Sequence, residues 1–163
     1  MVQKMRRNKQ KLSAEECEAL LKQNTSGVLA LVDNDGSPYA VPLSYVYSQN
    51  KLYFHSAAEG HKIAAIQACE KASFCVIDQD QVVPQEYTTY YRSVIAFGTV
   101  RISTDEQESE AAMRLLALKY YPQDSEEHRI HTIEASKSAY EVLVFTIERM
   151  SGKQARELIK GKR

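Results

Sequence analysis

The first half of the chain alternates apolar runs with short polar clusters, which is the pattern of β-hairpins. Gly27 to Val32 is a nearly continuous apolar run of strand length, and the cluster Asp33 to Gly36 that follows is typical of a turn. A second strand is predicted over Pro38 to Tyr47, and the turn Ser48 to Asn50 leads into a third over Leu52 to Ser56. Because these connections are short, the three strands are expected to run antiparallel.

Pro42 stands in the middle of the second predicted strand. Proline has no backbone N–H and cannot complete a hydrogen-bond ladder on both sides of a strand. The strand is therefore expected to be an edge strand at this point, to be bulged, or to turn toward a ligand.

Further strand patterns follow in the second half of the chain. Ala72 to Ile77 predicts a fourth strand, Tyr90 to Ile102 a fifth and Tyr140 to Met150 a sixth. The polar stretch Asp78 to Thr89 is predicted to be a long loop. Gly98 lies inside the fifth strand and is expected to mark a bulge or a bend.

Capping signals between the strands predict helices. Ser13 with Glu16 forms a capping box ahead of a helix over Ala14 to Gln23, and Thr104 with Gln107 forms a second capping box. The predicted helices after the first run from Ile63 to Cys69, from Thr104 to the stop at Tyr121-Pro122, from Ser125 to Glu134 and, marginally, within the basic tail 151–163.

Six strands with short connections and intervening helices indicate an α+β protein built on an antiparallel barrel, not a Rossmann sheet. The 163 residues suit a single domain over 1–163, in which 1–11 is a basic leader and 151–163 a basic tail. Hydrophobic residues make up 44% and charged residues 26%, a balance typical of soluble globular proteins.

The balance of charge argues against nucleic acid as the partner. The chain has 21 basic and 21 acidic residues, so the whole molecule produces no net field that attracts a polyanion. The basic leader is expected to be a solvated tail, and no apolar run is long enough for a membrane span or a signal peptide. A cytoplasmic protein with a small-molecule partner is expected.

Several kinds of catalytic site are disfavoured. Cys17, Cys69 and Cys75 have neither zinc-ligand spacing nor an even number for a disulfide framework. No GxSxG elbow supports a nucleophilic triad. His55 and His61 are six residues apart with no supporting Asp or Cys motif, so no metal site is expected.

The stretch from Leu52 to Cys69 changes from strand to helix spacing across a turn of small residues. His61 and Lys62 follow Gly60 at the start of the helix, where free N–H groups attract anions. This combination suits a phosphate, although the spacing is not that of a Walker A loop. An ordinary strand-to-helix connection with a solvated Lys62 is the alternative interpretation.

Four motifs together carry a family resemblance. Their order along the chain is Pro42-Leu-Ser-Tyr45, Leu52-Tyr-Phe-His-Ser56, Gly60-His-Lys62 and Tyr91-Arg-Ser-Val-Ile-Ala-Phe-Gly98. This set resembles the pyridoxamine 5′-phosphate oxidase-like split-barrel flavoproteins, most closely the nitroimidazole-resistance branch, over roughly residues 10 to 150. The resemblance implies a six-stranded antiparallel split β-barrel with flanking helices, and a homodimer with one FMN in each of two clefts at the subunit interface.

The same resemblance implies a cofactor site. Pro42 to Ser44 would pass along the isoalloxazine, Phe54 to Ala57 would meet the ribityl chain and phosphate, and the Gly60–Lys62 turn would bind the phosphate. Tyr91 to Val94 would reach the flavin from the partner subunit. The cofactor-binding set is then Pro42, Leu43, Ser44, Phe54, His55, Ser56, Ala57, Gly60, His61, Lys62, Tyr91, Arg92, Ser93 and Val94.

The implied function is that of an FMN-dependent oxidoreductase passing electrons to a small planar acceptor such as a nitroimidazole. His55 is the candidate catalytic donor, because its proton is shared near neutral pH; hydrogen bonding to the flavin or to a strand neighbour is the alternative role. The tail Gly152 to Arg156 does not reproduce the substrate motif of pyridoxamine phosphate oxidases. A flavin- or haem-binding module without turnover is the second hypothesis.

Overall fold

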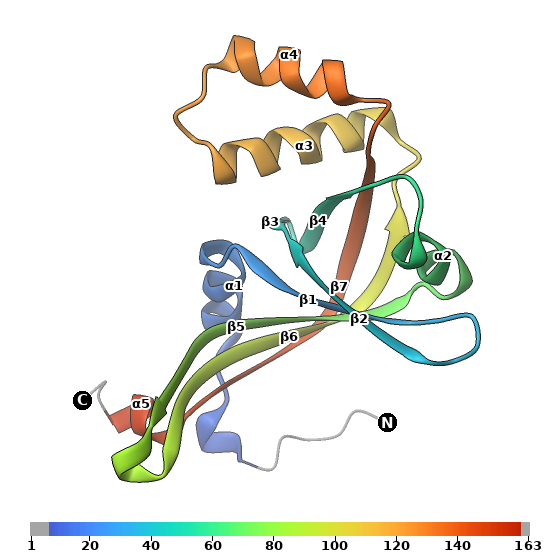
Figure 1. The fold of residues 1–163 in the computed structure, drawn as a ribbon. Coiled ribbons are helices and arrows are strands. Elements are labelled where there is room, and N and C mark those ends of the chain that lie inside the picture. Colours follow the sequence, from blue (N-terminus) through green and yellow to red (C-terminus); the bar gives the residue numbers. More distant parts are fainter. Residues whose placement is uncertain (1–6, 161–163) are drawn as a thin grey trace.

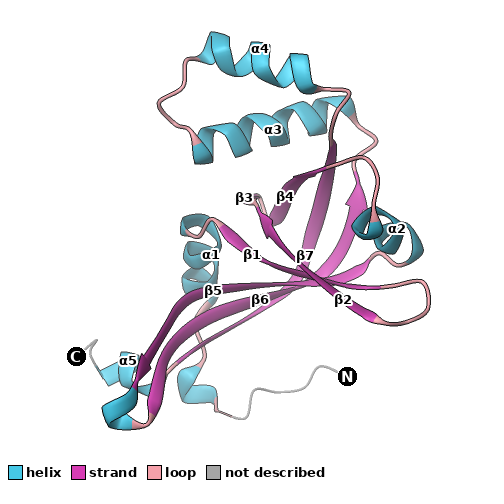
Figure 2. Ribbon diagram, viewed as in Figure 1, coloured by secondary structure: helices cyan, strands magenta, loops and turns pink. Residues whose placement is uncertain are grey.

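A computed structural model describes residues 7–160 as one antiparallel sheet with helices around it (Figure 1, Figure 2). The strands of this range are β1 (Ser26–Val32), β2 (Pro38–Ser44), β3 (Val46–Ser48), β4 (Lys51–Ser56), β5 (Lys71–Val83), β6 (Thr88–Ile102) and β7 (Glu141–Gln154). The helices are α1 (Ala14–Gln23), α2 (His61–Ala68), α3 (Glu106–Tyr120), α4 (Glu126–Ser136) and α5 (Arg156–Lys160), with short 3-10 helices η1 (Asn8–Gln10) and η2 (Pro84–Glu86).

The order of strands in the sheet is β2-β1-β5-β6-β7-β4-β3, and every neighbouring pair is antiparallel. The two end strands, β2 and β3, follow one another in the chain with only Tyr45 between them. The sheet therefore curls until its two ends meet at Tyr45, which makes a barrel that is open on either side of this residue. The predicted α+β antiparallel barrel is confirmed.

The described residues contain seven strands, so the predicted count of six was wrong. The difference arises at Tyr45, where the strand predicted over Pro38 to Tyr47 breaks in two. β2 pairs with β1, whereas β3 pairs with β4 on the far side of the barrel. One continuous strand cannot follow both neighbours, because the two lie on opposite sides of the opening.

Three aromatic rings form the centre of the core. Tyr45, Phe54 and Phe74 are each fully buried, and the ring of Phe74 lies 4.9 Å from that of Tyr45 and 5.1 Å from that of Phe54, centroid to centroid. Such edge-on ring contacts add to the free energy gained by burying apolar area. The break at Tyr45 is thus held by the core as well as by the sheet.

Helix starts mostly follow the predicted caps. The hydroxyl of Ser13 accepts from the Glu16 N–H at 3.1 Å and the Glu16 carboxylate accepts from the Ser13 N–H at 2.9 Å, so the capping box of α1 is confirmed. Ser125 caps α4 as predicted. At α3 the predicted cap, Thr104, was wrong, because Asp105 accepts from two backbone N–H groups with one carboxylate oxygen.

The predicted loop over Asp78 to Thr89 was wrong. β5 and β6 continue through this stretch as a long hairpin, which projects from the barrel at the lower left of Figure 1. Both faces of this ribbon have polar residues, so the sequence there lacks the alternation that indicates a half-buried strand. Its stability comes from the ladder between the two arms.

β6 and β7 settle two further predictions. The register between them shifts between Phe97 and Gly98, so the predicted bulge is confirmed. β7 extends to Gln154 rather than ending at Met150, and within the described part of the basic tail only α5 is helical. In the leader, Asn8 to Gln10 form η1, while residues 1–6 and 161–163 lie outside the described residues.

Candidate functional site

β2 and β4 flank the opening of the barrel with backbone edges that no described strand covers. Pro42 pairs with Val28 of β1, and β2 ends the sheet, so the predicted edge strand is confirmed. β3 accompanies β4 only as far as the pair of Val46 and Tyr53. Residues 54–56 therefore have β7 on one side and no described strand on the other. Backbone N–H and C=O groups of both segments are available to a ligand.

The C-terminal end of α3 holds the break at Tyr45. The backbone N–H of Tyr45 donates to the Tyr120 hydroxyl at 3.0 Å, and the Tyr45 hydroxyl donates to the Leu21 carbonyl at 2.8 Å. Lys119 Nζ donates to the carbonyls of Tyr45 at 3.0 Å and Asn24 at 2.5 Å. Burial lowers the pKa of Lys119 to about 8. These contacts fix the backbone immediately after the predicted isoalloxazine segment.

The start of α2 presents a cation without a counter-charge. Gly60 is the N-cap residue with φ of +120°, a conformation that favours glycine, and its carbonyl accepts from the N–H groups of Ile63 and Ala64. Lys62 is partly buried, and no described residue pairs with its ammonium group. Burial lowers the pKa of Lys62 because the charged form loses solvation. An anion bound at this helix start would compensate the Lys62 ammonium group for the solvation that it loses.

His61 faces the β1–β2 hairpin. Its Nε2 lies 2.5 Å from Oδ2 of Asp33, and its ring stacks on Tyr39 with centroids 4.1 Å apart. The hydrogen bond from His61 lowers the pKa of the Asp33 carboxyl. The hairpin is thereby attached to the start of α2, which brings β2 and the Gly60–Lys62 turn together. One ring nitrogen of His61 is occupied by Asp33, which leaves Lys62 as the more available cation.

Residues 54–57 differ in where their side chains lie. Phe54 is in the core, so only its backbone can meet a ligand, while Ser56 is buried and donates to the carbonyl of Ala57 at 2.9 Å. His55 is exposed and pairs with Val142, which packs beneath α3. Because directly paired residues project to the same side of a sheet, the imidazole of His55 lies on the α3 side. No described residue forms a hydrogen bond with it.

The Tyr91–Val94 segment is not beside Pro42 to Ser44 within one chain. Strands β1 and β5 lie between β2 and β6, so the two segments are separated by three strand spacings, about 14 Å. Arg92 forms an ion pair of 3.6 Å with Asp78, and Val94 is fully buried. The predicted site thus falls into two groups, with 42–62 near the opening and 91–94 on β6.

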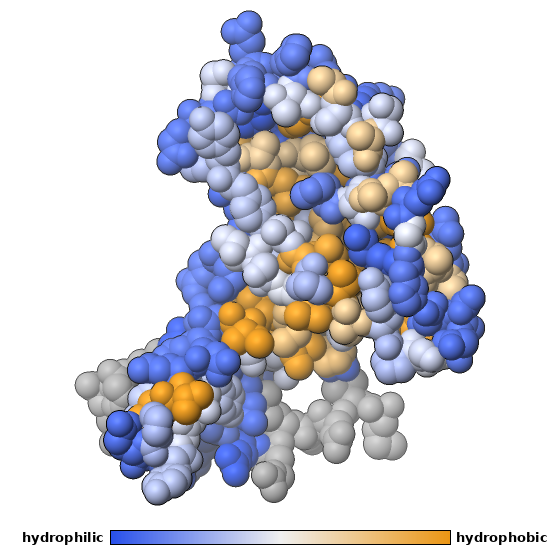
Figure 3. Space-filling model, viewed as in Figure 1, coloured by the Kyte–Doolittle hydropathy of each residue, from blue (hydrophilic) through white to orange (hydrophobic). Residues whose placement is uncertain are grey.

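A row of small and apolar side chains crosses the outer face of the sheet between these groups. Pro42, Val28, Cys75 and Ile95 are successive register partners on β2, β1, β5 and β6. Val28 and Ile95 are 37% and 36% exposed although their strands are central. Figure 3 shows hydrophobic residues across the middle of this face, in a hollow below α3 and α4. Exposed apolar surface of this kind is typical of an interface.

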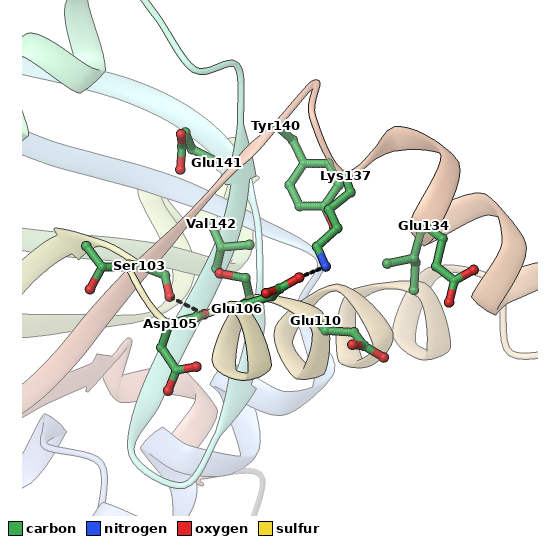
Figure 4. A pocket seen from close by; sticks show the side chains of 12 residues that line it. Ser103, Asp105, Glu106, Glu110, Glu134, Lys137, Tyr140, Glu141 and Val142 are labelled. Atoms are coloured by element: carbon green, nitrogen blue, oxygen red, sulfur yellow. Dashed lines mark hydrogen bonds and ion pairs between the residues drawn. The ribbon is translucent and has the colours of Figure 1, made fainter.

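The cavity beneath α3 and α4 has a different character (Figure 4). It encloses about 280 Å³, and its charged lining is mainly acidic. Lys137 points into it and forms an ion pair with Glu106. The acidic residues are Asp105, Glu106, Glu110, Glu134 and Glu141. A phosphate would be repelled here, so this cavity does not suit the predicted cofactor.

The described residues hold neither a cluster of metal ligands nor a membrane-spanning helix. No group of three or more His, Cys, Asp or Glu side chains is arranged to hold a metal ion within residues 7–160. None of the helices in that range is long and apolar enough to cross a bilayer.

Comparison with known proteins identifies the family. The sequence profile of the pyridoxamine 5′-phosphate oxidase family matches residues 13–154, which is most of the chain. The chain belongs to this family. The resemblance seen in the motifs is confirmed, and the opened barrel is the family's split barrel. No curated protein matches this sequence.

Solved structures agree on the fold. A protein of Bacteroides thetaiotaomicron described as a candidate 5-nitroimidazole antibiotic resistance protein is 22% identical, with a TM-score of 0.75, covering 88% of this chain and 85% of its own. An FAD-binding protein of Mesorhizobium loti is 27% identical, with a TM-score of 0.66 and coverages of 89% and 96%. An FAD- and haem-binding protein of Mycobacterium smegmatis is 22% identical, with a TM-score of 0.69 and coverages of 88% and 72%.

Sequence reasoning missed the residues that position the site. Asp33 lies 28 residues from its partner His61, and Lys119 lies 74 residues from Tyr45. The sequence pattern places Asp33 only in a turn and Lys119 only in a helix. No local pattern indicates contacts between residues that are so far apart in the chain. The weak signal for Asp33 was its place at a hairpin tip, where side chains can reach neighbouring elements.

Proposed function

We propose that this chain is an FMN-dependent oxidoreductase that works as a homodimer, with the flavin in clefts between subunits. Lys62 is the observation that carries this proposal. It is a partly buried cation at a helix start, without a counter-charge among the described residues, beside a turn opened by Gly60. A partly buried cation without a partner loses solvation that nothing replaces, and a phosphate supplies the missing charge.

The neighbouring segments suit the rest of the cofactor. The backbone edges of Pro42 to Ser44 and of residues 54–56 offer donors and acceptors to polar atoms of the flavin ring and ribityl chain. Lys62 would bind the phosphate, and His61, held by Asp33, would keep the turn in place. We propose FMN rather than FAD because the turn suits a terminal phosphate and the sequence has no GxGxxG pyrophosphate motif.

The dimer supplies the second wall of the cleft in this proposal. The apolar row Pro42, Val28, Cys75 and Ile95 is exposed in a single chain except at the partly buried Cys75, and it suits contact with a second copy. The segment Tyr91 to Val94 is separated from Pro42 in its own chain by the strands β1 and β5. In a dimer, this segment of the second copy would reach the flavin.

A bound flavin would supply the electron-transfer chemistry, while the protein binds it and orients the acceptor. We assign His55 as the residue that donates a proton to the acceptor. Its imidazole is exposed at the end of β4 and has no hydrogen-bond partner among the described residues. A small planar acceptor such as a nitroimidazole is the proposed substrate class, and the cytoplasmic location stays a prediction.

Anaerobic reoxidation tests the enzymatic part of the proposal. The purified protein is loaded with FMN, reduced with dithionite and mixed with a panel of nitroimidazoles and quinones while the flavin absorbance is followed. We expect at least one acceptor to reoxidise the protein faster than it reoxidises free reduced FMN, and His55→Ala to slow that reaction. If no acceptor does so, the protein is a binding module without turnover. If His55→Ala reacts as fast as wild type, the role assigned to His55 is wrong.

The binding module is the second candidate because of two relatives. The Mesorhizobium loti protein is described as FAD-binding and the Mycobacterium smegmatis protein as binding FAD and haem. Spectra of the protein titrated separately with FMN, FAD and haem distinguish these ligands. Tighter binding of FMN than of FAD or haem supports the proposal, whereas haem binding without flavin binding contradicts it.

A further inference from the structure

A basic cavity lies where the two ends of the described chain meet. Arg7, Asn8, Lys9 and Gln10, in and before η1, line it together with Arg156 at the start of α5. Its volume is about 440 Å³, and no acidic side chain is among these lining residues. The region lies at the bottom of Figure 1, at the opposite end of the molecule from α3 and α4.

The walls of this cavity are fixed by the sheet. The N–H of Leu12 donates to the carbonyl of Gly152 at 3.0 Å, and Lys11 forms an isolated bridge with Lys153 of β7. On the other side, the N–H of Ala155 donates to the Tyr91 carbonyl at 2.8 Å, just before Arg156. Both segments that carry the cations are thus anchored to the same end of the β6–β7 ladder.

Gln10 provides an independent sign of a ligand. Gln10 lines the cavity and is only 5% exposed, yet its buried amide oxygen has no hydrogen-bond partner among the described residues. Gln154, at the neighbouring end of β7, shows the same combination of 5% exposure and an unpartnered amide oxygen. Native proteins rarely leave buried polar groups unpaired, because the lost solvation is not recovered. A ligand in the cavity that Gln10 lines would supply such a partner.

We propose that this cavity binds a small phosphate-bearing anion. Arg7, Lys9 and Arg156 supply positive charge, and arginine guanidinium groups match phosphate oxygens in pairs of parallel hydrogen bonds. Hydrogenphosphate carries both anionic oxygens for these cations and an O–H group that donates to the Gln10 amide oxygen. The site is separate from Lys62 and does not depend on the proposed flavin function.

Isothermal titration calorimetry with inorganic phosphate, against sodium chloride at equal ionic strength, tests this site in the full-length protein. Arg156→Gln is expected to weaken phosphate binding by about tenfold or more. Lys11→Gln is the matched control, because it makes the same change of charge next to the cavity at a residue that does not line it. We expect at most about a twofold change for this control. No phosphate binding beyond the chloride reference, or equal losses in the two variants, would overturn the proposal.

Gln10→Leu separates a ligand-binding role from a structural one. Removing an unpartnered buried amide is expected to raise the Tm in phosphate-free buffer and to abolish the further rise that phosphate gives the wild type. A lower Tm in phosphate-free buffer would show that the amide has a partner within the fold, which overturns the proposal.

Lys62→Ala separates this site from the proposed flavin site. Any phosphate bound at the start of α2 should be lost in this variant, whereas phosphate binding at the cavity, and its dependence on Arg156, is expected to remain. If Lys62→Ala abolishes phosphate binding, phosphate binds at the start of α2 and the cavity proposal fails, although the flavin proposal does not. Conversely, a protein that binds phosphate but no flavin would contradict only the proposed function.

Discussion

Lys119 is a cation held between carbonyl groups at the junction of α3 with the break in the sheet. Its Nζ donates to the carbonyls of Asn24 and Tyr45 and lies 4.2 Å from the centroid of the Tyr45 ring. No carboxylate of the described residues forms an ion pair with it. The surroundings compensate its charge only partly, which is why burial lowers its pKa to about 8 from the ordinary 10.5.

This shift predicts a pH dependence of stability. Between pH 8 and 10.5 the folded protein binds fewer protons at Lys119 than the unfolded chain does, so the free energy of unfolding should rise with pH. We expect the stability of wild type relative to Lys119→Met to increase across this window and to stay constant below it. Urea denaturation at pH 7, 9 and 10 measures this difference.

Lys22→Met is the control for this prediction. Lys22 is exposed and pairs with Glu18, which raises its pKa instead of lowering it. Wild type should gain no stability relative to this variant between pH 8 and 10.5. A flat difference between wild type and Lys119→Met over the same window would show that Lys119 is solvated and ordinary.

Individual residues of the site were predictable where the chemistry is local. Gly60, His61 and Lys62 stand together in the sequence, and the change from strand to helix spacing placed them at a helix start, where the structure has them. The contact of His61 with Asp33 joins two distant turns, so no local pattern singles out Asp33 among the 21 acidic residues. The sequence also does not show which side chains of the site are buried: Phe54 and His55 are neighbours, yet Phe54 is buried and His55 is exposed.

At the scale of elements, the bulge between β6 and β7 shifts the register of two long paired strands by one residue. Gly98 lies at the register shift against β7, and a Cβ atom there would lie 1.9 Å from the backbone carbonyl oxygen of Thr146. Backbone cannot move aside as the end of a side chain can. The glycine is therefore required by close approach of the two strands.

Gly98→Ala is expected to lower the free energy of unfolding by about 1–3 kcal/mol, because the added methyl group forces the strands apart. The midpoint of urea denaturation measures this loss. Gly152→Ala is the comparison, since its added methyl group would meet the buried side chains of Cys17 and Leu12 rather than backbone. The prediction is wrong if Gly98→Ala costs no more than Gly152→Ala.

The extent of each element was predictable where one face is buried. α1 has a capping box and an apolar stripe, and it begins and ends where these signals place it. The β5–β6 hairpin has no buried face beyond the barrel, so its polar arms gave the signal of a loop. The break at Tyr45 depends on which strands lie beside β2 and β3, and local alternation carries no information about those neighbours.

At the scale of the whole molecule, the exposed apolar row should be the centre of a homodimer. Ile95→Glu places a charge in this row, on a residue that is already 36% exposed, so the fold of one chain should tolerate it. We expect wild type to be a dimer at micromolar concentration by light scattering, and the dissociation constant of Ile95→Glu to rise at least tenfold.

Val82→Glu is the control for the dimer prediction. Val82 is 67% exposed on the projecting β5–β6 hairpin, outside the apolar row. This variant should remain dimeric. A monomeric wild type, or equal dissociation of the two variants, would rule out the row as the centre of the interface.

The turn between β4 and α2 is proposed to bind the phosphate of a flavin, and comparing FMN with riboflavin tests this proposal most directly. Fluorescence titration of wild type and Lys62→Ala with both ligands isolates the contribution of the phosphate, because riboflavin lacks it. Loss of a charge-assisted contact costs about 1.5–3 kcal/mol. Lys62→Ala should therefore bind FMN about tenfold or more weakly, with the affinity for riboflavin unchanged. Lys71→Ala, which removes an exposed lysine at the start of β5, should leave both affinities as they are. Equal affinity of wild type and Lys62→Ala for FMN would contradict the claim.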